Sequence, residues 1–245
     1  MKAILLAAGR GSRLGSHTLH EPKCRTMLLG KRLIDRQLEA LREASIRDIA
    51  IVRGYMAGRI QVAGATYFEN REWEQTNMLT SLCCASDWLE REPCIVSYTD
   101  IVYTSDVIEL MLRADEDDDI VIPYNINWLP LWEDRFLNPL SDAETFRLGS
   151  DSRVIEIGGR PTSLQEVEGQ FMGLLRISPK GWLMIQQFLS LQDQSLVERM
   201  DLTALLAGLI EQGIAIKAIP YRGLWLEVDH ESDLLLYENK YGDRL

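Results

Sequence analysis

The chain has 245 residues, of which 46% are apolar and 26% are charged. These ordinary globular proportions exclude collagen-like, fibrous and intrinsically disordered proteins. A net charge of −11 argues against a broad nucleic-acid-binding face, so we expect no nucleic acid among the partners. We also expect no membrane insertion, because no apolar run approaches the roughly 18 residues of a membrane helix.

The cysteines and the first residues favour a cytoplasmic protein. No CxxC pair and no zinc-binding spacing is present among Cys24, Cys83, Cys84 and Cys94. Free thiols are typical of a reducing compartment. The apolar stretch Ala3–Ala8 is shorter than the about 7–15 residues of a secretory leader, so we expect the protein not to be exported.

The first half of the chain alternates buried apolar runs with helix-like segments. Strands are predicted at Lys2–Ala8, Asp48–Val52, Thr66–Phe68, Pro93–Tyr98 and Ile120–Tyr124. Helices are predicted at Leu33–Ala44, Asn77–Leu89 and Ser105–Ala114. This alternation indicates a parallel sheet with crossover helices.

The second half contains consecutive strands without intervening helices. Strands are predicted at Glu144–Leu148, Val154–Ile157, Gln170–Ile177 and Ile214–Pro220. Helices are predicted at Lys180–Leu189, Leu202–Gln212 and Asp233–Tyr241. With no repeat and no linker, residues 1–245 are predicted to form one α/β domain. Its single mixed, mainly parallel sheet is flanked by helices, and the roles of the two halves divide near residue 125.

A glycine-bearing loop follows the first strand. Gly9, Gly11 and Ser12 can bring backbone N–H groups close to phosphate oxygens, and Arg13 adds positive charge. Residues 1–36 carry eight Lys or Arg and two acidic residues, a local charge of +6. Leu14 breaks the dinucleotide fingerprint, and no Walker motif is present. The loop alone fits an anion site or a simple tight turn.

Several motifs together resemble the sugar-phosphate nucleotidyltransferase superfamily. They are LLAAGRGSRL at 5–14, EPK at 21–23, GKRLIDRQLEAL at 30–41, IVRGY at 51–55 and WLEVD at 225–229. TNMLTSL at 76–82 and YTDIVY at 98–103 resemble its choline-phosphate cytidylyltransferase-like branch. The pattern departs at Arg32, where proline is usual, and at Arg25, where an apolar residue is usual. The resemblance implies a Rossmann-like fold, with nucleotide binding by residues 1–125 and acceptor binding by residues 126–245.

The resemblance also implies the catalytic residues. Lys23 matches the family lysine that neutralises charge on the transferred phosphate, and Arg13 is expected to hold the departing phosphates. Asp100 and Asp229 match the two aspartates that bind Mg²⁺, the expected cofactor. Asp100 alone could equally be a loop residue, and Asp229 a helix cap.

The same resemblance implies contacts to the nucleotide. The expected binding residues are Leu6, Ala8, Gly9, Gly11, Ser12, Arg13, Asn77 and Ser81. The pair at the start of the predicted helix, Asn77 and Ser81, lies where the family reads the pyrimidine. Helix capping is an equally good explanation of Asn77.

The second half is expected to bind the acceptor. Its aromatic and acidic residues are Trp128, Trp132, Glu144, Glu168, Asp201, Trp225 and Glu227, and Asp142 belongs to the same mixture. Ring faces and carboxylates suit a cation such as choline or a primary amine. A sugar could stack on the same tryptophans, and packing in the core explains them equally well. Glu227 and Asp229 are expected on one face of an extended stretch, opposite Val228.

We therefore expect a magnesium-dependent enzyme that transfers a cytidylyl group from CTP to a small phosphorylated acceptor and releases pyrophosphate. Among possible acceptors, phosphocholine is the one we expect most, and related amino-alcohol phosphates and phosphonates come next. Such products usually serve to decorate surface glycans or lipids. The alternatives are a hexose-1-phosphate uridylyl- or thymidylyltransferase and a non-catalytic nucleotide-sugar sensor; an oligomer is compatible with the sequence. Lys23, Asp100 and Asp229 argue against the sensor.

Overall fold

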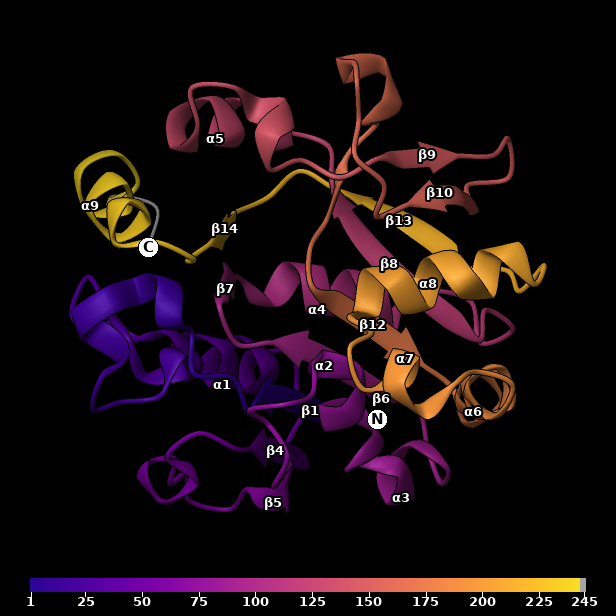
Figure 1. The fold of residues 1–245 in the computed structure, drawn as a ribbon, viewed down its shortest axis with the longest axis horizontal. Helices are drawn as coiled ribbons and strands as arrows, with labels where there is room; N and C mark the ends of the chain where they lie inside the picture. Colours follow the sequence, from indigo (N-terminus) through magenta and orange to yellow (C-terminus); the bar gives the residue numbers. More distant parts are fainter. Residues whose placement is uncertain (243–245) are drawn as a thin grey trace.

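The centre of the molecule is an eight-stranded mixed sheet, shown in Figure 1. The computed structural model describes residues 1–242. The strand order is β11-β8-β12-β6-β1-β4-β5, with β13 also paired to β8. The bounds are β1 (Lys2–Ala7), β4 (Ile49–Arg53), β5 (Thr66–Glu69), β6 (Cys94–Tyr98), β8 (Ile120–Asn125), β11 (Gln170–Phe171), β12 (Leu174–Ile177) and β13 (Lys217–Tyr221).

The sheet confirms the predicted fold class. Strand β1 pairs in parallel with both β4 and β6, and β4 pairs in parallel with β5. Strand β12 lies antiparallel between β6 and β8, which makes the sheet mixed. Three small ladders join β2 (Met27–Leu28) to β3 (Lys31–Arg32), β7 (Ile101–Tyr103) to β14 (Trp225–Glu227) and β9 (Phe146–Leu148) to β10 (Val154–Ile157).

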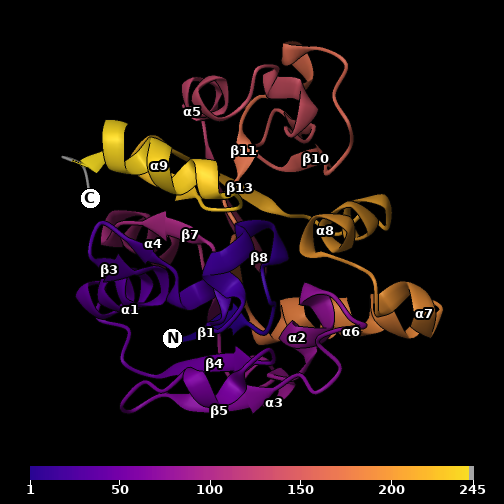
Figure 2. The same ribbon diagram turned by 60° about the vertical axis from the view of Figure 1, so that its left-hand side comes forward.

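Helices cover both faces of the sheet, as Figures 1 and 2 show. One buried cluster joins Ala3 and Leu5 of β1 to α1 (Leu33–Glu43), α4 (Ser105–Leu112), α5 (Trp128–Arg135) and α9 (Glu231–Lys240). The other joins Ile4 and Leu6 to α2 (Met78–Cys83), α3 (Ser86–Leu89), α6 (Pro179–Ser190) and α8 (Leu202–Glu211), with α7 (Gln194–Val197) connecting the last two. Successive residues of β1 point to opposite faces, so a continuous apolar run was required. None of the helices in residues 1–242 is long and apolar enough to cross a membrane.

Several segments differ from the predicted elements. The predicted helix Asn77–Leu89 is two helices, α2 and α3, because the backbone of Ala85, with a φ of −103° and a ψ of +18°, departs from helical geometry. The predicted strand Gln170–Ile177 breaks at Gly173, whose φ of +72° redirects the chain between β11 and β12. Helix α5 was not predicted. It contains Pro130, which lies in the first turn, where proline is tolerated.

The short β7–β14 ladder positions the candidate site. Glu227 pairs with Ile101, and the backbone N–H of Val228 donates to the carbonyl of Asp100 at 2.8 Å. Asp100, just after β6, therefore lies beside Asp229, just after β14. Both residues lie beyond the carboxyl ends of strands, where open α/β sheets bind ligands.

Candidate active site

Lys23 lies between the two aspartates. Its Nζ atom is 2.8 Å from Asp100 Oδ2 and 2.5 Å from Asp229 Oδ1. Arg13 Nη2 approaches the same Asp229 oxygen at 3.0 Å. The Lys23 side chain is only 12% exposed, whereas that of Arg13 is 59% exposed and can reach a ligand from solvent. Four residues that were predicted from motifs far apart in the chain thus form one charge cluster.

Burial and charge act in opposite directions on this cluster. Burial alone would lower the pKa of Lys23, but Asp100 and Asp229 outweigh it, and the net shift raises the pKa. Burial would raise the pKa of Asp229, but Lys23, Arg13 and Arg135 hold it below its ordinary value. The lysine is therefore charged at neutral pH, and Asp229 is ionised.

The two aspartates form a donor set suited to a hard cation. Asp100 Oδ1 is buried and has no hydrogen-bond partner among residues 1–242, so one carboxylate oxygen remains available. No group of three or more His, Cys, Asp or Glu side chains within residues 1–242 is arranged to hold a metal. Mg²⁺ commonly uses one or two carboxylates together with substrate phosphates and water. Asp100 and Asp229 fit that requirement.

The glycine loop packs against this cluster. Gly11 has a φ of +70°, and a Cβ built there would lie 2.6 Å from the Lys23 side chain. A Cβ at Gly9 would meet nothing within 4 Å, so the loop beside it is open. Ser12 begins the 3₁₀-helix Ser12–Thr18 and is exposed, and Leu6 and Ala8 are buried beneath the loop.

Asn77 and Ser81 both make contacts within the protein. Asn77 caps α2 by accepting from the N–H of Met78 at 2.8 Å. Ser81 is 5% exposed, and its hydroxyl accepts from Asn70 Nδ2 at 3.1 Å. Asn77 therefore caps α2, and Ser81, itself a residue of α2, is bonded to Asn70, while the nucleotide contacts of both stay predictions.

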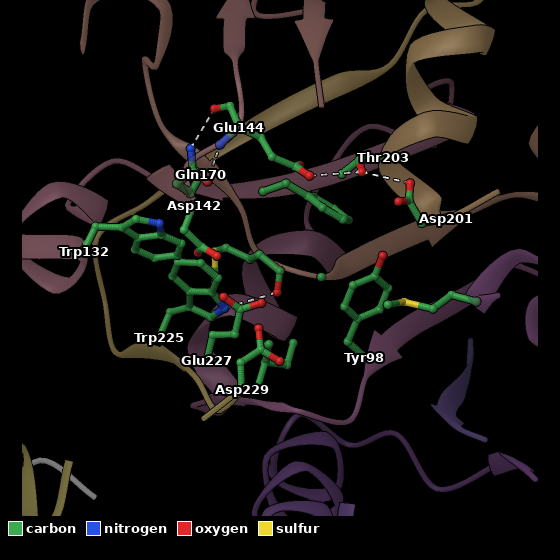
Figure 3. Close-up of a pocket in the computed structure, with 15 residues that line it drawn as sticks. Tyr98, Trp132, Asp142, Glu144, Gln170, Asp201, Thr203, Trp225, Glu227 and Asp229 are labelled. Atoms are coloured by element: carbon green, nitrogen blue, oxygen red, sulfur yellow. Dashed lines mark hydrogen bonds between the residues drawn. The ribbon is translucent and has the colours of Figure 1, made fainter. Parts of the chain in front are cut away.

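A pocket of about 210 Å³ opens beside Asp229 and is drawn in Figure 3. Its walls come from β6, α5, β11, α8 and β14. Five carboxylate residues line it: Asp142, Glu144, Asp201, Glu227 and Asp229. The other lining residues are Met78, Tyr98, Ile101, Trp132, Gln170, Phe171, Met172, Gly173, Thr203 and Trp225. Among these residues there is no Lys or Arg.

The predicted acceptor-binding residues do not all reach this pocket. Trp132 and Trp225 form one wall as a stacked pair with ring centroids 5.4 Å apart, opposite Tyr98 and Asp201 (Figure 3). Trp128 is 4% exposed and packs edge-on against Trp132 from behind. Glu168 is not among the lining residues, and it accepts from the N–H of Leu148 at 3.2 Å.

Two acids from separate elements meet across Thr203. The Thr203 hydroxyl lies 3.0 Å from Asp201 Oδ1 and 3.5 Å from Glu144 Oε1. Burial, reinforced by the nearby Asp201, raises the pKa of Glu144 to about 7. This arrangement gathers negative charge that a cationic ligand would neutralise.

Sequence reasoning missed several lining residues. Tyr98, Gln170 and Thr203 are absent from the predicted site, although Tyr98 begins the quoted YTDIVY motif. Gln170 fixes the backbone of Glu144, donating from Nε2 to its carbonyl at 2.9 Å. The predicted alternation does hold at β14, because Glu227 and Asp229 line the pocket while Val228 is fully buried.

Comparison with known proteins relates this chain to enzymes that transfer nucleotidyl groups. Residues 3–161 match the model of the MobA-like NTP transferase domain. A CTP:phosphoglutamine cytidylyltransferase from Campylobacter jejuni is 36% identical, covering 96% of this chain and 98% of that protein. A choline-phosphate cytidylyltransferase from Streptococcus pneumoniae is 48% identical over 56 residues, 23% of this chain and 24% of that protein.

A solved structure agrees with the fold. The inositol-1-phosphate CTP transferase from T. maritima superposes with a TM-score of 0.74 at 20% identity, covering 97% of this chain and 94% of that one. Fold and sequence define a nucleotidyltransferase, as the motifs predicted. The chain belongs to the MobA-like NTP transferase domain family.

Proposed function

We propose that this protein transfers the cytidylyl group of CTP to a small phosphorylated acceptor that carries a cationic nitrogen, with Mg²⁺ as cofactor. The observation that carries the proposal is a pocket with aromatic walls and five carboxylate residues, directly beside the Lys23 cluster. The nucleotide assignment rests on the nearly full-length relative from C. jejuni, whose name specifies CTP.

The chemistry needs positioning and charge neutralisation more than a base. A phosphate oxygen of the acceptor attacks the α-phosphorus of CTP, and the bond to the β-phosphate oxygen breaks as pyrophosphate leaves. The attacking phosphate is already an anion, so no side chain has to remove a proton. Lys23 would meet charge on the transferred phosphate, and Arg13 would hold the departing phosphates; their contacts with Asp100 and Asp229 support these roles.

Asp100 and Asp229 are the residues that would hold Mg²⁺. When bound, the ion neutralises the phosphate charge that develops during transfer. The unpartnered Oδ1 of Asp100 supports this assignment.

The pocket favours acceptors with an ammonium group. The five carboxylate residues that line the pocket attract a cation. Phosphocholine, phosphoethanolamine and aminoalkylphosphonates carry one, and glutamine phosphate carries an α-ammonium group. In the alternative, a hexose 1-phosphate with UTP or dTTP, the sugar would stack on the tryptophan rings. Trp132 and Trp225 instead stack on each other and are 3% and 4% exposed.

A substrate panel tests this proposal. Purified protein is given CTP, UTP or dTTP with phosphocholine, phosphoethanolamine, glutamine phosphate or glucose 1-phosphate, and pyrophosphate release is measured. We expect kcat/KM to be highest with CTP and a cationic acceptor. A higher value for glucose 1-phosphate with UTP or dTTP would overturn the proposal in favour of the alternative.

The metal assignment is tested with Asp100→Asn. We expect kcat to fall at least about 100-fold and Mg²⁺-dependent CTP binding to weaken in calorimetry, because one of two carboxylate ligands is lost. Asp119→Asn is the matched control, since Asp119 is 16% exposed against 17% for Asp100 and also bonds to a lysine, outside the pocket. Normal activity of Asp100→Asn would rule out a metal role for this residue.

A further inference from the structure

Arg135 is a buried cation that the reaction described above does not use. It is the last residue of α5, and its side chain is 0% exposed. Its Nη1 donates to Glu227 Oε2 at 3.0 Å, while Nε and Nη2 donate to the two oxygens of Asp233 at 3.1 and 3.2 Å. One planar guanidinium therefore holds two carboxylates from different elements.

Asp233 connects Arg135 to the backbone at Asp229. Its Oδ2 accepts from the N–H of Asp229 at 2.8 Å and from the N–H of His230 at 2.9 Å. Asp233 lies in the first turn of α9 and is 2% exposed. The carboxylate of Asp233 therefore holds the segment between β14 and α9. Arg135 orients this carboxylate by donating a hydrogen bond to each of its two oxygens.

Arg135 also contacts two residues that line the acceptor pocket. Its guanidinium carbon lies 5.0 Å from the ring centroid of Trp132, one of the pocket walls. Glu227, which it bonds, lines the same pocket, and its side chain is 23% exposed. A single side chain therefore connects the aromatic wall, a pocket carboxylate and the Asp229 segment.

We propose that Arg135 is a positioning residue that aligns the Lys23 cluster with the acceptor pocket. It holds Asp229 in place indirectly, through Asp233, and it holds Glu227 directly, through the hydrogen bond from Nη1. The proposal rests on the proposed function only in assigning Asp229 and Glu227 to the reaction. Arginine suits this task better than lysine, because its fork reaches three oxygens in one plane while an ammonium is a point charge.

Arg135→Lys keeps the charge and removes the fork. We expect kcat at saturating Mg²⁺ and substrates to fall at least about tenfold, while Mg²⁺-dependent CTP binding weakens less than in Asp100→Asn, because Asp229 is misplaced but its carboxylate is not lost. Amide exchange at Asp229 and His230, followed by NMR, should accelerate at least about tenfold. Arg176→Lys is the control: Arg176 is 6% exposed and donates to carbonyls of Ala114 and Asp118, outside the site.

The control should keep kcat and the exchange of these two amides within about twofold of the wild type. The proposal is overturned if Arg135→Lys retains normal kcat, or if exchange at Asp229 and His230 is unchanged. Should Arg135→Lys not fold, Asp233→Asn removes the same paired contact and carries the same expectations. If the wild type turns over no substrate of the panel, the proposed function fails, but amide exchange still decides the positioning role.

Discussion

At the scale of single residues, the site works by opposing charges that are held out of water. Lys23 is 12% exposed, and its ammonium contacts Asp100 and Asp229 rather than solvent. A buried lysine would tend to lose its proton, but two adjacent carboxylates keep it charged. Under the proposed function, the free enzyme would thus already hold a charged Lys23 for the incoming phosphates, and only the partners of this lysine would change when the nucleotide binds.

Glu144 gives a testable pH dependence. Burial raises its pKa to about 7, and Asp201 and Asp142 add to the shift, while Thr203 opposes it. A cationic acceptor favours the ionised carboxylate, so binding lowers this pKa and strengthens as pH rises through 7. We expect KM for a cationic acceptor to fall about tenfold between pH 6 and pH 8, because the ionised fraction of a carboxyl group with a pKa of about 7 rises from roughly one-tenth to roughly nine-tenths.

Glu144→Gln provides the control for this measurement. The amide cannot ionise, so KM should be higher throughout and lose its extra pH dependence, leaving only that of the acceptor phosphate itself. Parallel pH profiles for the wild type and Glu144→Gln would show that Glu144 does not face the acceptor cation.

At the scale of elements, the turn after β1 determines where Lys23 lies. Gly11 combines a left-handed backbone with contact to the Lys23 side chain, so both its φ and its missing Cβ matter. Gly30 has a similar φ of +73°, but a Cβ there would meet nothing within 4 Å. Substitution of each glycine in turn therefore distinguishes the cost of backbone strain from the effect of displacing the Lys23 side chain.

Gly11→Ala and Gly30→Ala can therefore be compared directly. Each should lose about 1–2 kcal/mol of folding stability from the left-handed backbone, measured by denaturant unfolding. Gly11→Ala should lose more, and its kcat should fall at least about tenfold because Lys23 must move. Gly30→Ala should keep kcat within about twofold. Equal kcat values in the two variants would contradict the proposed contact between Gly11 and Lys23.

At the scale of the whole molecule, the two parts of the chain share one sheet. Strand β12, from the second half, lies between β6 and β8 of the first half. Every strand that pairs with β8 follows residue 125, since its partners are β11, β12 and β13. The sheet cannot be divided at this point without leaving β8 unpaired.

Residues 1–125 alone should therefore not fold cooperatively. We expect the fragment to lack a sharp thermal transition in circular dichroism, whereas the full chain should melt in one transition that coincides by dichroism and tryptophan fluorescence. Cooperative unfolding of the fragment would show two independent domains, against the predicted single domain of residues 1–245.

The sequence by itself determined features that depend on short stretches of chain. The apolar run of β1, the glycine loop and Asp100 after a buried strand are local patterns, and burial on both faces permits few other structures. Lys23, Asp100 and Asp229 could be assigned because the motifs that carry them resemble a known superfamily. Their meeting point depends on the tertiary structure, because Asp229 follows β14, which pairs antiparallel with β7 outside the central sheet.

Only the tertiary structure decided which polar side chains share the pocket. Glu144 and Asp201 converge on Thr203, whereas Glu168 lies outside the lining and Trp128 packs behind Trp132. Composition cannot separate these residues, because the direction of each side chain depends on how distant elements pack. Arg135 shows the same limit, since its importance comes from two carboxylates far along the chain that fold around one buried guanidinium.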